Sequence, residues 1–195
     1  MARGDTAHAA RYPLPAQRGL RLFVGAGQCS TCHVGPRFSH GEFGDIGVPF
    51  FVRPGVVDPR RHGGIAALRA SPCNLLSRWS DDPAGEAALK TRHVQTEQRN
   101  FGEFKVPGLR NVALTAPCMH NGSLPTLDAV VRRYDRMDPG RVHADGEQIL
   151  RPLRFTEGQR ADLVVFLGTL SDPGSATWQL AAPPPCTATA GPGKP

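Results

Sequence analysis

Two thiols and an imidazole lie within five consecutive residues, Cys29-Ser-Thr-Cys-His33. Thiols at this spacing can each form a thioether with a vinyl group of haem, and the imidazole that follows can bind the iron from one side. The pattern therefore predicts one covalent haem c, attached through Cys29 and Cys32, with His33 as the proximal iron ligand.

A dithiol redox pair and half of a zinc site are the alternatives for a Cys-x-x-Cys pattern. A zinc site needs a second ligand pair at comparable spacing, and the three remaining cysteines, Cys73, Cys118 and Cys186, stand alone. At most two of these three could pair with each other, and the sequence does not say which. The adjacent His favours the haem interpretation over both alternatives.

A helix is predicted on each side of the haem motif in the chain. Over residues 16–25, Leu20, Phe23 and Val24 follow the i, i+3, i+4 spacing of one helix face. Over residues 157–170 an apolar face recurs behind a capping-box pattern, in which Thr156 caps the helix and Glu or Gln follows three residues later. Two such helices packed across each other are the arrangement of cytochrome c folds.

The expected fold class is therefore mostly α, a cytochrome c-like single domain with long irregular loops around one covalent haem. The 22 Gly and 19 Pro account for the loops. We divide the chain into a flexible N-terminal arm (1–15), the haem domain (16–172) and a Pro/Ala-rich disordered tail (173–195), which lacks helical or strand periodicity.

Charge and hydropathy narrow the class of protein. The net charge is +6, but the basic residues are spread along the chain without interleaved aromatics, so nucleic-acid binding is not expected. The longest apolar runs fall far short of a membrane span. Residues 1–17 lack the apolar region of an export signal. Because haem c is attached outside the cytoplasm, we nevertheless expect a periplasmic or otherwise exported protein whose signal is not visible in this chain.

A third helix is predicted after Thr126, which is a good N-cap. Leu127, Val130, Val131 and Tyr134 share one face of this helix at i, i+3, i+4 and i+7 spacing. Tyr134 therefore points where the apolar residues point, which is inward.

Five further motifs accompany the haem motif along the chain. They are Arg18-Gly-Leu-Arg-Leu-Phe23, Gly44-Asp-Ile-Gly-Val-Pro49, Phe104-Lys-Val-Pro-Gly-Leu-Arg-Asn-Val112, Ala116-Pro-Cys-Met-His-Asn-Gly122 and Thr126-Leu-Asp-Ala-Val-Val-x-x-Tyr134. Over roughly residues 16–172, this combination resembles the C-terminal haem domain of bacterial di-haem cytochrome c peroxidases and their MauG-like relatives.

The resemblance implies a function in electron transfer. In that family the N-terminal haem reacts with peroxide and the C-terminal haem accepts or stores electrons. This sequence holds one haem motif, and too little chain precedes it for another haem domain. We therefore expect an electron-transfer domain that passes single electrons to or from a peroxidatic haem not present in this chain, on a redox protein or a second haem domain. A stand-alone monohaem shuttle, or a peroxidase using this single haem on H2O2, remain the alternatives, so enzymatic activity is open.

The resemblance also suggests the distal iron ligand. In the peroxidases a Met on the helix after the His-Asn/Asp-Gly turn binds the iron, and in MauG-like members a Tyr takes its place. Tyr134 matches that position, and Met137 and Met119 are the rival ligands. A core Tyr with a hydrogen-bonded hydroxyl is the alternative for Tyr134.

Calcium is a secondary expectation from the same resemblance. Family members bind Ca2+ between their domains, partly through backbone oxygens of a Leu-Thr-x-Pro stretch, which Thr115 and Pro117 match. Because the second domain is not in this sequence, we do not expect Ca2+ to be a main cofactor.

Overall fold

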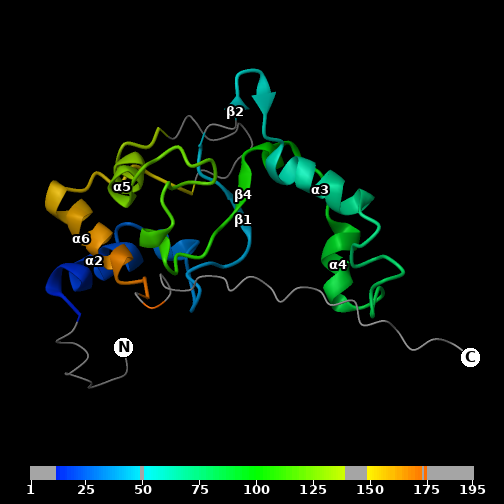
Figure 1. Ribbon diagram of the computed structural model, residues 1–195, viewed down its shortest axis with the longest axis horizontal. Coiled ribbons are helices and arrows are strands. Elements are labelled where there is room, and N and C mark those ends of the chain that lie inside the picture. Colours follow the sequence, from blue (N-terminus) through cyan, green and yellow to red (C-terminus); the bar gives the residue numbers. More distant parts are fainter. Residues whose placement is uncertain (1–11, 49–50, 139–148, 173, 175–195) are drawn as a thin grey trace, which may run out of the picture.

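The computed structural model describes residues 12–48, 51–138, 149–172 and 174. Most of the predicted arm and nearly all of the predicted tail lie outside these residues. The described part contains five α-helices and two small two-stranded sheets (Figure 1). The helices are α2 (Leu14–Val24), α3 (Arg60–Ala70), α4 (Glu86–His93), α5 (Leu127–Asp135) and α6 (Glu157–Gly168).

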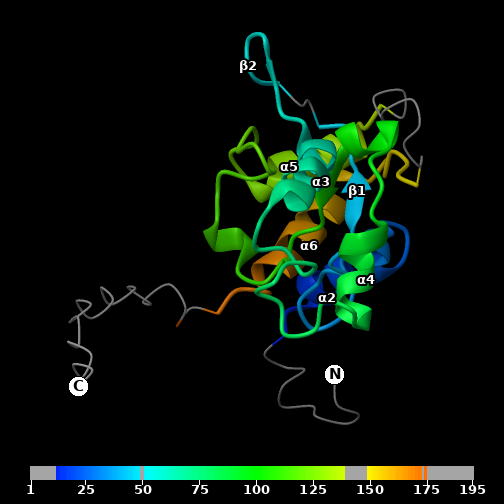
Figure 2. The same ribbon diagram turned by 90° about the vertical axis from the view of Figure 1, so that its right-hand side faces the viewer.

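Helices α2 and α6 lie side by side and form the most extensive contact between elements (Figures 1 and 2). Gly19 is the point of closest approach, because a Cβ atom at this residue would lie 2.1 Å from the carbonyl oxygen of Asp162. Arg18 then donates two hydrogen bonds to the Asp162 carboxylate, at 2.6 and 2.7 Å. A glycine and an ion pair thus fix how the first and last helices cross.

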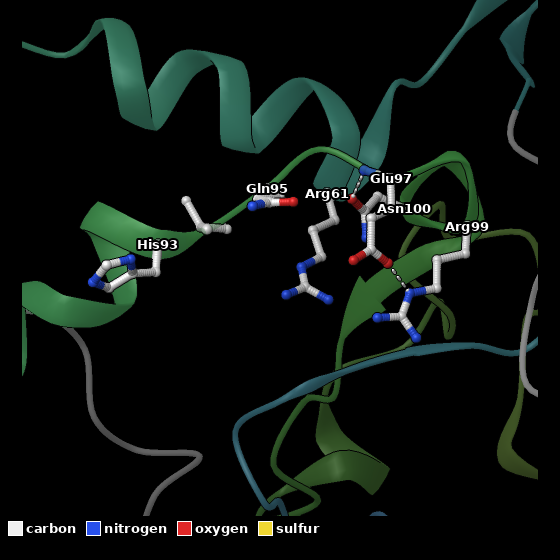
Figure 3. Close-up of a pocket in the computed structure, with 7 residues that line it drawn as sticks. Arg61, His93, Gln95, Glu97, Arg99 and Asn100 are labelled. Atoms are coloured by element: carbon white, nitrogen blue, oxygen red, sulfur yellow. Dashed lines mark hydrogen bonds and ion pairs between the residues drawn. The ribbon is translucent and has the colours of Figure 1, made fainter.

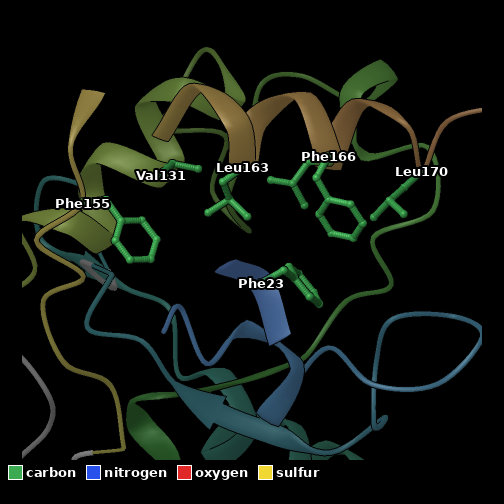
Figure 4. Close-up of a cluster of buried hydrophobic side chains, with 7 residues drawn as sticks. Phe23, Val131, Phe155, Leu163, Phe166 and Leu170 are labelled. Atoms are coloured by element: carbon green, nitrogen blue, oxygen red, sulfur yellow. The ribbon is translucent and has the colours of Figure 1, made fainter. Parts of the chain in front are cut away.

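The main core lies between α2, α5 and α6 (Figure 4). Phe23 on α2 reaches toward Phe166 on α6, with ring centroids 5.1 Å apart, and Val131 of α5 belongs to the same cluster. The full set of buried members is Phe23, Val131, Phe155, Leu163, Phe166, Leu167 and Leu170. Most residues of the apolar faces predicted for these three helices therefore pack in this core, but Val24 at the end of α2 is 60% exposed, against the prediction.

The helix caps follow their predicted chemistry. The Thr126 hydroxyl accepts a hydrogen bond from the Ala129 N–H and begins α5. Thr156 and Gln159 exchange side-chain and backbone hydrogen bonds at the start of α6, which confirms the predicted capping box. The first helix begins at Leu14, two residues before the predicted boundary, because a proline in its first turn already has the helical φ.

The remaining elements form a second half beside this core. Strand β1 (Phe43–Asp45) pairs antiparallel with β4 (Glu103–Lys105), and β2 (Phe51–Arg53) pairs with β3 (Val56–Val57). The β1–β4 pair lies between the two halves, and α3 and α4 lie beyond it (Figure 1). The sequence predicted neither sheet. Three short turns of 3-10 helix complete the described part: η1 (Cys29–Thr31), η2 (Gln98–Phe101) and η3 (Val112–Leu114).

Candidate haem-binding site

The haem motif forms a tight turn directly after α2. Gln28 has a left-handed backbone (φ 51°) and precedes η1, and the His33 N–H donates to the Cys29 carbonyl at 2.9 Å. Gly27 leaves room for this turn, since a Cβ there would lie 2.7 Å from the Leu22 carbonyl oxygen and 3.3 Å from the Cys29 Sγ. The crossing of α2 with α6 therefore determines where the motif lies.

His33 is held in one tautomer by a backbone carbonyl. Its Nδ1 donates to the carbonyl oxygen of Phe38 at 2.9 Å, so in the neutral ring Nε2 carries the lone pair that could bind a metal, and the Pro107 backbone also contacts the ring. Burial lowers the pKa of His33, so the neutral imidazole that iron binding needs is favoured. Phe38 has a left-handed backbone (φ 53°), and its ring packs against Phe23 and Phe166.

Cys29 and Cys32 are half-buried free thiols. Burial raises the pKa of both thiols, that of Cys29 to about 11, so both are protonated near neutral pH. Two unpaired thiols beside an imidazole with an available Nε2 fit the donor set of a covalent haem c. No group of three or more His, Cys, Asp or Glu side chains in the described ranges could hold a separate metal ion.

Tyr134 comes from α5 to the same place. Burial raises its pKa to about 12, and the neighbouring Cys29 and Cys32 thiols add to the shift while Arg133 opposes it. Cys29 also packs against the core cluster that contains Val131, one helical turn before Tyr134. The structure thus brings together the four residues Cys29, Cys32, His33 and Tyr134, although they come from two segments about 100 positions apart in the sequence.

The two rival ligands lie in different surroundings. Met137 follows the end of α5 and is buried, with 7% of its surface exposed. Met119 is half-buried and has a left-handed backbone (φ 70°) in the turn after Cys118, a buried free cysteine. Cys73, by contrast, is an exposed free cysteine, and Cys186 lies outside the described residues.

Arg110 and Phe38 support the turn that holds the haem motif. The Arg110 Nε donates to the Pro36 carbonyl at 2.9 Å, and its guanidinium lies 5.0 Å from the centre of the Phe38 ring. Arg110 thereby supports the turn whose carbonyl orients His33. A phenylalanine with positive φ carries no local sequence signal, so only the folded turn identifies it.

The residues matched to the calcium stretch lie on an exposed loop. Thr115 and Pro117 are both exposed, and the Thr115 hydroxyl donates to the Val112 carbonyl at 3.2 Å. These contacts leave calcium binding a prediction.

A polar pocket of about 270 Å³ lies elsewhere, between the start of α3, the end of α4 and η2 (Figure 3). Its lining consists of Arg61, His93, Val94, Gln95, Glu97, Arg99 and Asn100. Arg99 is paired with Glu97, and Arg61 reaches Glu103 at 2.6 Å. The pocket shares no residue with the haem motif, and its charges are largely compensated.

No helix among the described residues is long and apolar enough to cross a membrane.

Proteins with similar sequences include bacterial cytochrome c peroxidases and MauG. The chain is 33% identical over 168 residues to cytochrome-c peroxidase IdrP1 of Denitromonas iodatirespirans, a match that covers 80% of this chain and 40% of that protein. It is 31% identical over 163 residues to methylamine utilization protein MauG of Methylorubrum extorquens, covering 83% and 36%. No protein-family model matches. The chain spans about two fifths of the length of these curated relatives.

Solved structures give the same result. A MauG-like protein associated with microbial copper homeostasis matches with a TM-score of 0.55 and 25% identity, over 82% of this chain and 47% of that one. The diheme peroxidase BthA from Burkholderia thailandensis matches with a TM-score of 0.53 and 25% identity, over 84% and 44%. The family resemblance predicted from the motifs is confirmed: over about 80% of its length this chain is similar to bacterial cytochrome c peroxidases and MauG proteins.

Proposed function

We propose that this chain is a c-type haem electron-transfer domain of the di-haem peroxidase and MauG type. Its haem would be attached through Cys29 and Cys32 and bound by His33, with Tyr134 as the second iron ligand. It would pass single electrons to or from a peroxidatic haem that is not in this chain, on a redox protein or a second haem domain. We further propose that the domain works in the periplasm or another exported location, because haem c is attached outside the cytoplasm.

The observation that carries this proposal is the state of His33 beside two free thiols. The Phe38 carbonyl accepts from His33 Nδ1 at 2.9 Å, so in the neutral ring the lone pair lies on Nε2, and the Pro107 backbone is a second contact that holds the ring in place. Cys29 and Cys32, both free and half-buried, lie on the same turn. A dithiol oxidoreductase does not need an imidazole that is oriented in this way beside its two thiols.

When bound, haem supplies a one-electron redox centre whose potential depends on its ligands and burial. The residues of this chain control that environment. As an iron ligand Tyr134 would bind as the phenolate. Because burial raises its pKa to about 12, the phenol is protonated near neutral pH without the metal, and its proton would be released to solvent when the ligand binds. A phenolate is a hard, anionic ligand, so we expect it to favour the ferric state and a lower potential than a Met would give.

The direct test is to mature the full chain in a host that attaches haem c. We expect the mass of one haem per chain, one haem by pyridine haemochrome assay, and a six-coordinate ferric spectrum. Tyr134→Phe should change the low-temperature EPR spectrum and raise the potential. Met137→Leu is the matched control in the same segment and should leave both unchanged. A colourless chain at its bare mass would overturn the proposal.

The same sample tests the peroxidase alternative. A peroxidase needs an open or displaceable position on the iron. We expect the optical spectrum of the purified chain to stay unchanged when H2O2 is added, because Tyr134 would fill that position. A rapid spectral change with turnover of a reduced donor would instead show that this single haem acts on peroxide.

A further inference from the structure

The end of α5 is joined to the start of α6 by a compact group of polar contacts next to Tyr134. The Asp135 carboxylate accepts from the Phe155 N–H at 2.5 Å through one oxygen and from Arg160 Nη1 at 2.9 Å through the other. Arg160 Nη1 also donates to the Phe155 carbonyl at 2.5 Å. Asp135 therefore binds the backbone N–H of Phe155, and its ion-pair partner Arg160 binds the backbone carbonyl of the same residue.

This ion pair is shielded from solvent. The side chains of Asp135 and Arg160 are only 12% and 14% exposed, and Phe155 is buried in the main core. The Tyr134 carbonyl accepts from the Leu153 N–H at 3.2 Å, so the backbone of Tyr134 belongs to the same network. A pair in such surroundings has stronger and more directional contacts than an exposed pair.

A second link between the same helices is exposed and lies farther from Tyr134 along the helix. Arg132 Nη2 contacts the Glu157 carboxylate at 2.5 Å, and Arg132 Nε contacts Asp128 at 2.7 Å. The side chains of Arg132 and Glu157 are 37% and 67% exposed, so this link contributes little to rigidity. The chain thus offers a buried and an exposed connection between the same two helices, and the two meet at Glu157, which Arg160 Nη2 also contacts at 2.5 Å.

We propose that Asp135 and Arg160 are positioning residues for the distal iron ligand, an inference that rests on the proposed function. They fix the last turn of α5 against α6, and α6 is packed on α2, the helix that leads into the haem motif. The phenol of Tyr134 and the imidazole of His33 are thereby held by one continuous framework. Without the pair, the last turn of α5 is free to shift, and Tyr134 ligates only part of the molecules.

The test compares Asp135→Ala with Arg132→Gln in the full, haem-loaded chain. We expect Asp135→Ala to reduce the low-spin, Tyr-ligated EPR signal at least several-fold, with a matching gain of high-spin signal and a higher potential. Arg132→Gln should keep the wild-type spectrum and potential, even if it lowers the melting temperature. If Asp135→Ala lowers the melting temperature but leaves spectrum and potential unchanged, the pair is merely structural and the inference is wrong.

Two conservative variants keep the inference testable if Asp135→Ala does not fold. In Asp135→Asn the amide oxygen can still accept from Phe155, whereas the ion pair is lost, so an intermediate EPR change is expected. Arg160→Lys keeps the positive charge but loses the guanidinium geometry in which Nη1 contacts both the Asp135 carboxylate and the Phe155 carbonyl, so it should also be intermediate. Wild-type spectra in both variants would overturn the inference. Tyr134→Phe, measured alongside, separates the two claims: if it has no effect on the spectrum, the ligand assignment in the proposed function fails first.

Discussion

The two halves of this molecule are held together by different kinds of contact. Between α2, α5 and α6, seven buried apolar residues form one continuous cluster. Around α3, α4 and η2, three of the buried side chains are polar, namely Arg60, Thr91 and Asn100. Ile65 of α3 is buried, but several large apolar residues of this second half are exposed, namely Leu68, Leu75, Leu76, Trp79 and Leu89.

The difference explains where the chemistry lies. The haem motif follows α2 directly, and Tyr134 ends α5, so both are built on the apolar half. Close packing transmits the position of one side chain to its neighbours, which suits the proposed iron site, whose two proposed ligands come from distant segments. The polar half holds Arg60 through hydrogen bonds to the Val48 and Gly102 carbonyls, at 2.5 and 2.8 Å, and contains no predicted iron ligand.

The largest contrast between the halves should come from their cysteines. Replacing Cys29 and Cys32 together by Ala removes both thioether sulfurs, so we expect no covalent haem by mass and by haemochrome assay after denaturation. Cys73→Ala, an exposed cysteine of the other half, is the control and should keep one haem per chain. Covalent haem in the double variant would contradict the assigned attachment.

Removing one aromatic side chain from each half should give the next largest effect. Phe166 is 3% exposed and contacts the rings of Phe23 and Phe38, so Phe166→Ala should destabilise the folded chain by about 3–5 kcal/mol. Trp79 is 68% exposed, and Trp79→Ala should change stability by less than about 0.5 kcal/mol. Denaturant titration followed by circular dichroism measures both, and equal losses would remove the distinction between the halves.

Two helical glycines sharpen the comparison further. At Gly19 an added methyl group meets the Asp162 carbonyl and the Phe166 Cβ, so Gly19→Ala should cost about 2–3 kcal/mol. At Gly64, inside α3, a Cβ would meet nothing within 4 Å, so Gly64→Ala should stabilise the chain by about 0.5–1 kcal/mol. Thermal unfolding of the two variants should therefore shift in opposite directions. A neutral Gly19→Ala would show that α2 and α6 can separate without loss.

The sequence predicted the apolar half well because the patterns that specify its helices and the haem motif each lie within one short segment. The spacing of Leu20 and Phe23, the Thr156–Gln159 capping box and the Cys-x-x-Cys-His pattern each lie within one short segment. Helical periodicity also predicted that Tyr134 points inward, and in the structure this side chain lies near Cys29 and Cys32. What the sequence did not predict depends on contacts between distant segments, such as the β1–β4 pairing. The left-handed backbone of Phe38 belongs to this class too, since only the folded turn favours it.

The smallest effect tests whether polar contacts truly hold the second half. Asn100 is 2% exposed; its amide oxygen accepts from the Glu97 N–H at 2.7 Å, and its amide nitrogen donates to Glu103 at 2.9 Å. Asn100→Ala leaves these partners unsatisfied in a buried place, so we expect a loss of about 1–2 kcal/mol. Asn74 also makes one hydrogen bond of each kind, but at the surface, and Asn74→Ala should cost less than about 0.5 kcal/mol.

Hydrogen exchange should locate the Asn100→Ala effect in the second half. We expect faster exchange in α4, η2 and β4, while the amides of α2 and α6 keep their protection, because the apolar core does not depend on Asn100. If α2 and α6 lost protection to the same extent, the halves would unfold as one cooperative unit. The polar half would then be part of the framework that holds the haem ligands, and its contacts would bear on Tyr134 as directly as the apolar core does.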